Sequence, residues 1–597
     1  MADTRHLIWA AIFLLMVSPI RAQRAGAATG DEYAPVRDEM NRPITAGGFQ
    51  KDAPVIFVDW TRESGLDSFQ HRSGSKDKRY ILETPSGGVA LFDYNNDGWL
   101  DIYLVNGSTL AALKGKEPAP KAALFHNDGN GKFTDVTERA GVANQRWGFG
   151  VVSGDINNDG WADLIVTNFG KDRLYRNNKD GTFTDIAETA GVATEGWTTA
   201  AALGDFNKDG YLDLFVAGYL DFNPESPPEP DSPEIGSSFC EYRGERVMCG
   251  PRGLKGTRDY LFLNNGDETF TEVAAKAGVE DKPGYYGFAA SWADMDDDGL
   301  LDLLVANDST PNYLYRNKGD GTFEDISYYS GFALNEYGRE QAGMGLAIAD
   351  YNNDGRLDVY MTHFSDDYNT LYRNEGDAFF MDVSFQVGVG EPSIPFLAWG
   401  TGFLDYDNDG LKDIFVANGH VYPGVDAQDW GTTWAQRPLL FRNLDGSRFE
   451  PVPAAEKSGL GLVVPARGAA FGDLDNDGRV DAVLNCIDSS PRVLKNVSQS
   501  GHHWVSLKLT GAPGSPRDAV GATVYLTAGG KRQRGDVIAG TSYASHSDLR
   551  LHFGLGSAER IEQLEILWPS GRRQALEDLP VDQILTIEED QLRISVE

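Results

Sequence analysis

Basic residues are scarce in this chain of 597 residues, which carries 53 lysines and arginines against 89 aspartates and glutamates. The formal net charge of −36 excludes the basic face that nucleic-acid-binding proteins present, and it repels anionic membranes. Two explanations of the acidic excess remain: a solvated acidic surface, or carboxylates that hold cations. The placement of the aspartates, described below, favours the second.

Long hydrophobic runs are also lacking. The apolar run Leu7 to Val17 has eleven residues, whereas a membrane-spanning helix needs about 20. Arg5 and His6 precede the run and a small-residue exit at Ala22 follows it, which is typical of a secretory signal. The sequence therefore predicts a signal peptide over residues 1–22, a flexible segment over 23–50, no membrane span, and a secreted, periplasmic or cell-surface location.

Cysteine is nearly absent, with three residues in the chain. In an exported protein the short spacing of Cys240 and Cys249 predicts a local disulfide, although two free thiols are the alternative. Cys486 lies in an apolar run and is expected to be a buried small hydrophobe. The chain also has no Gly-x-Ser-x-Gly elbow, His-Glu-x-x-His motif or phosphate-binding loop.

What is present is one nine-residue pattern, repeated seven times. Positions 1, 5 and 9 are always Asp, position 3 is Asn or Asp, and position 6 is always Gly. The predicted metal ligands are Asp93, Asn95, Asp97 and Asp101; Asp155, Asn157, Asp159 and Asp163; Asp205, Asn207, Asp209 and Asp213; Asp294, Asp296, Asp298 and Asp302; Asp350, Asn352, Asp354 and Asp358; Asp405, Asp407, Asp409 and Asp413; and Asp473, Asp475, Asp477 and Asp481.

This spacing has a chemical reason. Calcium takes six to eight oxygen ligands, and a tight loop can direct side chains 1, 3 and 5 at one point while position 9 closes the cage. Glycine at position 6 permits the sharp turn. An EF-hand would need an acid at position 12, where this chain has Leu, Val or Met, and flanking helices. The runs on both sides are strand-like, so we expect about seven Ca²⁺ sites on strand–loop–strand units.

The rest of each repeat is equally regular. A strand ending in Leu-aromatic-x-Asn, as at residues 124–127 and 174–177, is followed by a turn and a strand that starts with Phe. Each unit offers about four strands, which predicts an all-β fold with a seven-bladed propeller over residues 51–497. Residues 57–66 match the end of a repeat but precede the first loop, so they would complete the last blade and close the ring. A calcium-loaded β-helix is the alternative, but its units are much shorter.

The last hundred residues, 498–597, are predicted to form a small β-sandwich-like domain. Its His502, His503, His552 and Ser570 are interpreted as structural. Two insertions interrupt the repeats, a Pro- and Glu-rich segment at 219–255 and a loop at 419–437 with His420, Tyr422, Trp430 and Trp434. The aromatic residues of the second insertion would either contact a ligand or pack down as a lid.

The loops and their Gly-rich lead-in strands resemble the FG-GAP/VCBS repeats of integrin α-chain propellers. Residues 518–524, 552–556, 568–571 and 582–588 resemble the ASPIC/UnbV domain. Together these resemblances cover about residues 50 to 597, and the whole is similar to the cartilage acidic protein family and its bacterial relatives. The EGF-like module of the vertebrate form is expected to be missing from this chain.

These features predict an exported calcium-binding protein that acts as an extracellular binding, adhesion or scaffold module for a protein or glycan partner. A biosynthetic or hydrolytic enzyme is one alternative, and a cell-surface carbohydrate binder that uses Trp430 and Trp434 is another. A deep pocket with converging histidines and carboxylates would favour the enzyme, whereas a filled central channel would favour binding.

Overall fold

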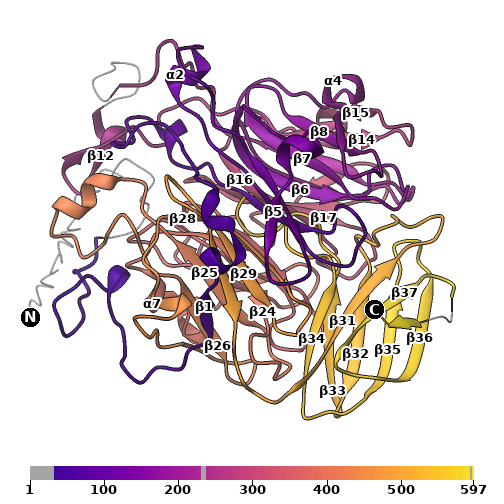
Figure 1. The fold of residues 1–597 in the computed structure, drawn as a ribbon. Helices are drawn as coiled ribbons and strands as arrows, with labels where there is room; N and C mark the ends of the chain where they lie inside the picture. Colours follow the sequence, from indigo (N-terminus) through magenta and orange to yellow (C-terminus); the bar gives the residue numbers. More distant parts are fainter. Residues whose placement is uncertain (1–31, 230–236, 592–593, 597) are drawn as a thin grey trace, which may run out of the picture.

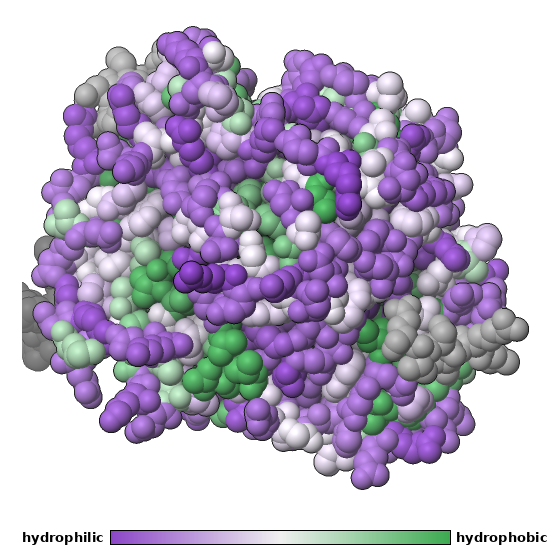
Figure 2. Space-filling model, viewed as in Figure 1, coloured by the Kyte–Doolittle hydropathy of each residue, from purple (hydrophilic) through white to green (hydrophobic). Residues whose placement is uncertain are grey.

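The computed structural model describes residues 32–229, 237–591 and 594–596. The predicted signal peptide, residues 1–22, lies outside the described residues. Among the described residues no helix has the length and apolar character to cross a bilayer. The visible face is mostly hydrophilic with separate hydrophobic patches (Figure 2).

The repeat region is built on seven four-stranded antiparallel sheets (Figure 1), and their strand order is consistent with a β-propeller. Innermost strand first, the sheets are β2 (Val89–Phe92), β3 (Asp101–Leu104), β4 (Ala123–Asn127) and β5 (Phe133–Asp135); β6 (Trp147–Gly154), β7 (Asp163–Phe169), β8 (Arg173–Asn177) and β9 (Phe183–Asp185); β10 (Thr198–Gly204), β11 (Asp213–Gly218), β14 (Tyr260–Asn264) and β15 (Phe270–Glu272); β16 (Gly287–Ala293), β17 (Asp302–Asn307), β18 (Tyr313–Asn317) and β19 (Phe323–Asp325); β20 (Leu346–Ala349), β21 (Asp358–Met361), β22 (Thr370–Asn374) and β23 (Phe380–Asp382); β24 (Ala398–Leu404), β25 (Asp413–Asn418), β26 (Leu439–Asn443) and β27 (Phe449–Pro451); and β28 (Ala466–Gly472), β29 (Asp481–Cys486), β30 (Arg492–Asn496) and β1 (Phe57–Asp59).

The last sheet joins the two ends of the repeat region. β1 pairs antiparallel with β30, and Phe57 lies opposite Asn496. The prediction that residues 57–66 complete the last repeat is therefore confirmed. Each innermost strand also contacts the innermost strand of the next sheet, and β28 contacts β2. The innermost strands of the seven sheets therefore contact one another in a closed sequence.

Short helices lie in the segments that connect the strands. Five of the seven α-helices follow an outer strand and end at a glycine in the left-handed conformation, which stops the helix after one turn. The helices are α1 (Thr61–Ser64), α2 (Leu110–Leu113), α3 (Thr137–Ala140), α4 (Ala187–Ala190), α5 (Ala274–Ala277), α6 (Ser384–Val387), α7 (Gly390–Ser393), and the 3₁₀ helices η1 (Ile44–Ala46), η2 (Leu66–Ser68), η3 (Ile81–Glu83), η4 (Ser237–Cys240), η5 (Pro423–Ala427) and η6 (Gly459–Gly461).

The C-terminal region forms two further four-stranded sheets that share one core with each other and with the second and third repeat sheets. One sheet has the order β34-β31-β37-β38 and the other β33-β32-β35-β36, and the pair β31 and β37 is parallel. The strands are β31 (His503–Thr510), β32 (Thr523–Ala528), β33 (Lys531–Asp536), β34 (Leu551–Gly556), β35 (Ile561–Leu567), β36 (Arg573–Leu579), β37 (Gln583–Glu588) and β38 (Ile594–Val596).

Residues 537–549, which link β33 to β34, run between the innermost strands of the seven repeat sheets; we call them the plug. Backbone hydrogen bonds join the plug to β2, β6, β10, β20 and β28, and the Ser542 hydroxyl accepts one from β24. The ring of Tyr543 contacts Phe288 of β16 at 5.7 Å between centroids. Gly88 allows this approach, because a Cβ atom there would lie 2.2 Å from the Ala544 carbonyl. The axis of the seven sheets is therefore filled by the C-terminal region.

Both insertions fold over the far end of this axis, and we call their described residues the lid. His420 and Tyr422 are buried, and Trp430 packs edge-on against Tyr242 at 5.3 Å. The hairpin β12 (Glu241–Tyr242) and β13 (Glu245–Arg246) lies in the first insertion, at the opposite end of the molecule from the C-terminal strands (Figure 1). Of the two possibilities for the 419–437 loop, the structure favours a lid.

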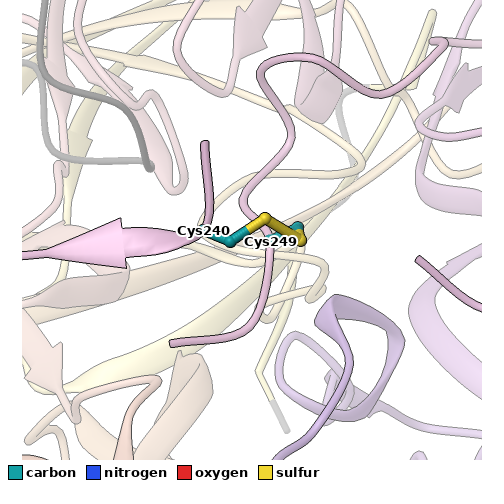
Figure 3. Close-up of a disulfide and its surroundings, with 2 residues drawn as sticks. All are labelled: Cys240 and Cys249. Carbon is teal, nitrogen blue, oxygen red and sulfur yellow. A yellow bond between two sulfur atoms is a disulfide. The ribbon is translucent and has the colours of Figure 1, made fainter. Parts of the chain in front are cut away.

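The disulfide Cys240–Cys249 closes the lid hairpin (Figure 3), which favours a location outside the reducing cytosol. Cys486 is a buried free thiol, as expected. The segment predicted to be flexible, 23–50, is described from residue 32 onward, and there it lies against the lid. The Thr45 carbonyl accepts a hydrogen bond from Arg437 N–H, and the Thr45 hydroxyl contacts that of Thr433 at 2.8 Å.

Candidate calcium sites

Each aspartate loop joins the innermost strand of a sheet to the second strand, as predicted. In the first loop, the Asp93 carboxylate accepts hydrogen bonds from the backbone N–H groups of Asp97 (3.1 Å) and Gly98 (3.0 Å). Gly98 has a φ of 87°, which the turn requires. Asp101 begins the second strand and accepts a bond from Tyr94 N–H at 3.1 Å. Backbone N–H groups thus hold the carboxylates of positions 1 and 9 in fixed places in the loop.

Position 9 is linked to a residue that the ligand pattern does not include, the Asn at the end of the third strand. Asn127 N–H donates to Asp101 at 2.8 Å, and its side-chain amide donates to the carbonyls of Leu100 in its own loop and Leu474 in the preceding loop. The same three-way arrangement recurs in every sheet. The seven residues are Asn127, Asn177, Asn264, Asn317, Asn374, Asn443 and Asn496. Each Asn therefore fastens two neighbouring loops together.

Position 4 forms a second link around the ring. All seven position-4 residues have a φ between 53° and 61°, which Asn tolerates better than most residues. Where position 4 is Asn, its side-chain amide donates to the position-6 carbonyl of the next loop. The five bonds run from Asn96 to Gly160, Asn158 to Gly210, Asn353 to Gly410, Asn408 to Gly478, and Asn476 to Gly98. The last of these joins the seventh loop to the first.

The fourth loop has Asp297 at position 4 and cannot make this bond, but the C-terminal region supplies it. Arg534 of β33 donates to Asp297 at 2.7 Å and to the Gly355 carbonyl of the fifth loop at 2.8 Å. Its other nitrogens pair with Asp536, and the Arg534 side chain is 1% exposed. The guanidinium therefore takes the place of the missing Asn amide in the ring of loops.

Burial and mutual repulsion raise the pKa of carboxylates in the aspartate loops. Desolvation raises the pKa of Asp294 and of Asp405 to about 7, and nearby carboxylates add to the effect. At position 9, burial raises the pKa well above the usual range in six loops. Asp101 is raised only to about 6, because the His126 ring bonds to it. A bound cation would compensate this charge.

Three loops bring the carboxylates of positions 1, 3 and 9 within 4.8 Å of one another: Asp294, Asp296 and Asp302; Asp405, Asp407 and Asp413; and Asp473, Asp475 and Asp481. Oxygens that surround one Ca²⁺ at about 2.4 Å lie within about 5 Å of each other. In two of these clusters, Oδ1 of Asp407 and Oδ1 of Asp475 are buried without a hydrogen-bond partner. Unpartnered buried carboxylate oxygens are costly unless a cation meets them, so these clusters fit a metal ion such as Ca²⁺. The other four loops have Asn at position 3 and the same backbone hydrogen bonds.

The C-terminal region lies on the loop face of the sheets. Asp518 accepts from Asp155 N–H at 2.9 Å, Arg550 donates to Asn476 at 2.9 Å, and the His552 ring bonds to Asn408 at 2.8 Å. Burial lowers the pKa of His552 to about 3, so it is neutral. The four C-terminal residues that were interpreted as structural do not converge on one site: His502 and His552 contact the sixth loop, His503 pairs with Asp582, and Ser570 donates to Glu589.

Some of these residues could have been found from the sequence. The Asn at the end of the third strand recurs in each repeat, and that recurrence was visible, but its role as a link between loops was not. Arg534 gives no such signal, because it belongs to a different domain from the loop that it completes.

Sheets of this order, each with an aspartate loop at one end, are consistent with a β-propeller that carries candidate cation sites. An FG-GAP-like repeat model matches residues 93–166, 155–216, 251–305, 294–361, 350–416 and 405–484, more than half of the chain, and an ASPIC and UnbV model matches residues 512–593. The chain belongs to the FG-GAP-like repeat family and carries a C-terminal ASPIC/UnbV domain.

Cartilage acidic protein 1 of Xenopus tropicalis is 27% identical over 319 residues, and that of Homo sapiens is 26% identical over 317. Each match covers 52% of this chain and 45% or 44% of the relative, so it spans about half of either protein. Among solved structures, an Agrocybe aegerita lectin specific for non-reducing terminal N-acetylglucosamine has a TM-score of 0.36 at 16% identity, covering 72% of this chain and 97% of that one. Trypanosoma rangeli sialidase has a TM-score of 0.32 at 11% identity, covering 62% and 56%. Both TM-scores are below 0.5, so neither structure bears on the function of this chain.

The substitution Arg534→Ala is expected to lower the free energy of unfolding of the full chain by about 3 kcal/mol, because it leaves the buried Asp536 carboxylate without its partner. Arg532 lies two residues earlier on the same strand and is 59% exposed, so Arg532→Ala should change stability by less than about 0.5 kcal/mol. Denaturant midpoints in calcium compare the two. Equal losses in both variants would contradict the role given to Arg534.

Proposed function

We propose that this protein is an exported, calcium-binding, seven-bladed β-propeller that acts as an extracellular binding, adhesion or scaffold module. The organisation that we propose is a signal peptide at 1–22, a propeller over 51–497 with the insertion 219–255, and the ASPIC/UnbV domain over 498–597. Seven sheets in circular contact and the pairing of β1 with β30 support seven blades. The disulfide supports export.

The calcium assignment extends from three clusters to seven loops by equivalence. All seven loops share the hydrogen bond from the position-6 N–H to the position-1 carboxylate. All seven also hold position 9 against the Asn of the third strand. Seven loops with the same backbone hydrogen bonds are expected to bind one kind of ion, and Asp and Asn oxygens suit Ca²⁺.

One observation carries the binding role: the plug fills the propeller axis from the loop face, and the lid covers the other end. His420 at the lid is buried, and burial lowers its pKa to about 3. Arg467 beside it is also buried and donates to backbone carbonyls, with its guanidinium 4.4 Å from the Trp399 ring centroid. Such a filled axis supports a scaffold that binds partners on its surface.

The first experiment counts calcium in the dialysed full chain by elemental mass spectrometry, and we expect seven ions per chain. Replacing the three acids of the fourth loop (Asp294→Asn, Asp296→Asn and Asp302→Asn) should reduce the count to six. The matched control replaces three exposed turn aspartates (Asp267→Asn, Asp320→Asn and Asp445→Asn) and should leave seven. Fewer than three ions in the unaltered chain would refute the calcium assignment.

The second arm of the same test addresses the partner. The calcium-loaded chain is immobilised and exposed to the native secretome and to a glycan array, each with calcium and with EDTA. We expect saturable, calcium-dependent retention of a protein. Glycan retention that is lost in Trp430→Ala and Trp434→Ala would instead favour the carbohydrate binder, and no retention of either kind would contradict a binding module.

A further inference from the structure

One exposed aromatic surface stands apart from the rest of the described chain. Every Tyr or Phe that is exposed there lies in it: Tyr33, Tyr328, Tyr329, Tyr337, Phe379 and Phe385. Tyr329 is 80% exposed and Tyr337 is 63% exposed. Exposed aromatic clusters of this kind on an otherwise polar protein mark interaction sites, since scattered single residues are the norm elsewhere.

These residues come from segments that the structure brings together. The turn after β19 meets β23, because Phe380 N–H donates to the Ser330 carbonyl at 2.7 Å. Tyr337 lies edge-on to Tyr368 at 6.4 Å, and Tyr368 lies 4.7 Å from Phe385 between ring centroids. Five of the six exposed rings thus belong to the fourth and fifth blades, and Tyr33 of the N-terminal segment lies beside Tyr337 and Phe385 in the groove described next.

At the lid end this surface opens into a groove of about 500 Å³. Tyr33, Tyr337, Phe385 and Trp430 contribute aromatic walls, and Glu391 contributes a carboxylate. The volume lies within the range of ligand sites, which combine aromatic walls with a few polar groups. Trp430 of the lid therefore forms part of the groove wall.

The charge around the groove is negative. Asp366 is neutralised by Arg243, which donates to it at 2.8 Å. Glu336, Asp382 and Glu391 form no ion pair with a basic side chain in the described residues. Asp382 is held close to the rings, because it accepts the Tyr368 hydroxyl at 2.7 Å and the Glu336 N–H at 3.1 Å.

We propose that this groove and the adjoining aromatic surface bind a basic segment of a partner polypeptide, whose Lys and Arg side chains lie on the tyrosine faces beside these carboxylates. Aromatic faces attract cations, and Tyr and Arg dominate the energetics of protein interfaces. The chain's net charge of −36 also favours a cationic partner over an anionic one. This inference deepens the proposed binding role and rests on it.

The test titrates the calcium-loaded full chain with an octa-arginine peptide in 0.15 M salt, by calorimetry. The double variant Tyr329→Ala with Tyr337→Ala should weaken binding about ten-fold, since each exposed cation–π contact contributes a factor of about three. The conservative pair Tyr329→Phe with Tyr337→Phe keeps the rings and should bind within two-fold of the unaltered chain. All four substitutions are at exposed positions, so folding should be unaffected.

A charge-matched pair separates this site from general attraction to an acidic protein. Glu336→Gln with Glu391→Gln should weaken binding about five-fold, whereas Glu562→Gln with Glu577→Gln, at exposed positions of the C-terminal domain, should leave it unchanged. Equal effects of the two pairs would overturn the proposal, as would affinity that survives loss of the rings. Binding of an N-acetylglucosamine oligomer in the groove, with no peptide binding, would also overturn it and assign a glycan ligand.

The calcium count and the melting temperature of each variant are measured alongside. A chain that binds the peptide through these rings but holds no calcium would contradict the proposed function, and the peptide-binding role of the aromatic surface would still stand. A chain with seven ions whose peptide binding ignores the rings would contradict this inference alone.

Discussion

Removal of calcium with EDTA is expected to lower the melting temperature of the full chain by on the order of 10 °C. At free calcium ten times its Kd, one site stabilises the fold by about 1.4 kcal/mol and seven independent sites by about 10 kcal/mol. The unfolding entropy is about 2.1 cal/mol/K per residue, so a propeller of several hundred residues moves by about 1 °C per kcal/mol. Calorimetry of the same sample with calcium and with EDTA measures the shift.

The size of the EDTA effect should depend on pH. Without calcium, burial raises the pKa of Asp155, Asp294 and Asp405 to about 7 in the folded chain, above about 3.9 for an unfolded Asp. The folded chain therefore binds more protons than the unfolded chain between about pH 4 and 7, and its stability falls as pH rises through that window. With calcium bound, the carboxylates are ionised and this fall should be absent.

We therefore expect the gap in melting temperature between the calcium and EDTA samples to be larger at pH 7.5 than at pH 5. The variant with three exposed turn aspartates replaced should show the same gap as the unaltered chain at both pH values. An unchanged melting curve with EDTA at pH 7.5 would show that the loops do not need an ion to hold their shape.

The aspartate loops could be predicted from the sequence because they are local. Nine consecutive residues set the turn, and Gly98 and its six equivalents mark the point where the backbone must adopt a positive φ. The pairing of β1 with β30 was also predictable, since residues 57–66 repeat a motif that the chain otherwise shows at the end of each unit.

The links between loops could not be predicted, because their partners are distant in the chain. Asn374 bonds to the carbonyl of Met295, 79 residues away, and Arg534 bonds to Asp297 at a separation of 237. A repeat reveals which residue recurs, but the contact it makes depends on how neighbouring units pack.

The lid and the N-terminal segment show the limit of composition as a guide. The Pro- and Glu-rich insertion 219–255 indicates a surface loop, yet its Tyr242 is buried against His420, Tyr422 and Trp430. Residues 32–50 have no strand pattern, but Thr45 and its neighbours bond to the 419–437 loop. The position of both segments is therefore decided by contacts with parts of the chain that are distant in sequence.

Loss of the plug is expected to uncouple the C-terminal domain from the propeller. Residues 541–547 supply carbonyl acceptors to Leu91, Val151 and Leu346 on three different innermost strands. Replacing these seven residues with a Gly-Ser sequence of equal length removes the side chains that hold the plug in place. Calorimetry should then resolve two transitions, and the amides of Leu91, Val151 and Leu346 should exchange with solvent faster.

A single substitution measures how much the packing of the plug contributes to the stability of the chain. Tyr543 is fully buried between Phe288 and Trp399, and its hydroxyl donates to the Pro85 carbonyl at 2.6 Å. Tyr543→Ala should therefore cost about 3–5 kcal/mol, the usual loss for a large buried aromatic residue. Tyr329→Ala, at an exposed position, is the matched control and should cost less than about 0.5 kcal/mol. If the Gly-Ser replacement keeps one transition at the original temperature, the aspartate loops alone hold the two domains together, and the plug only fills space along the axis.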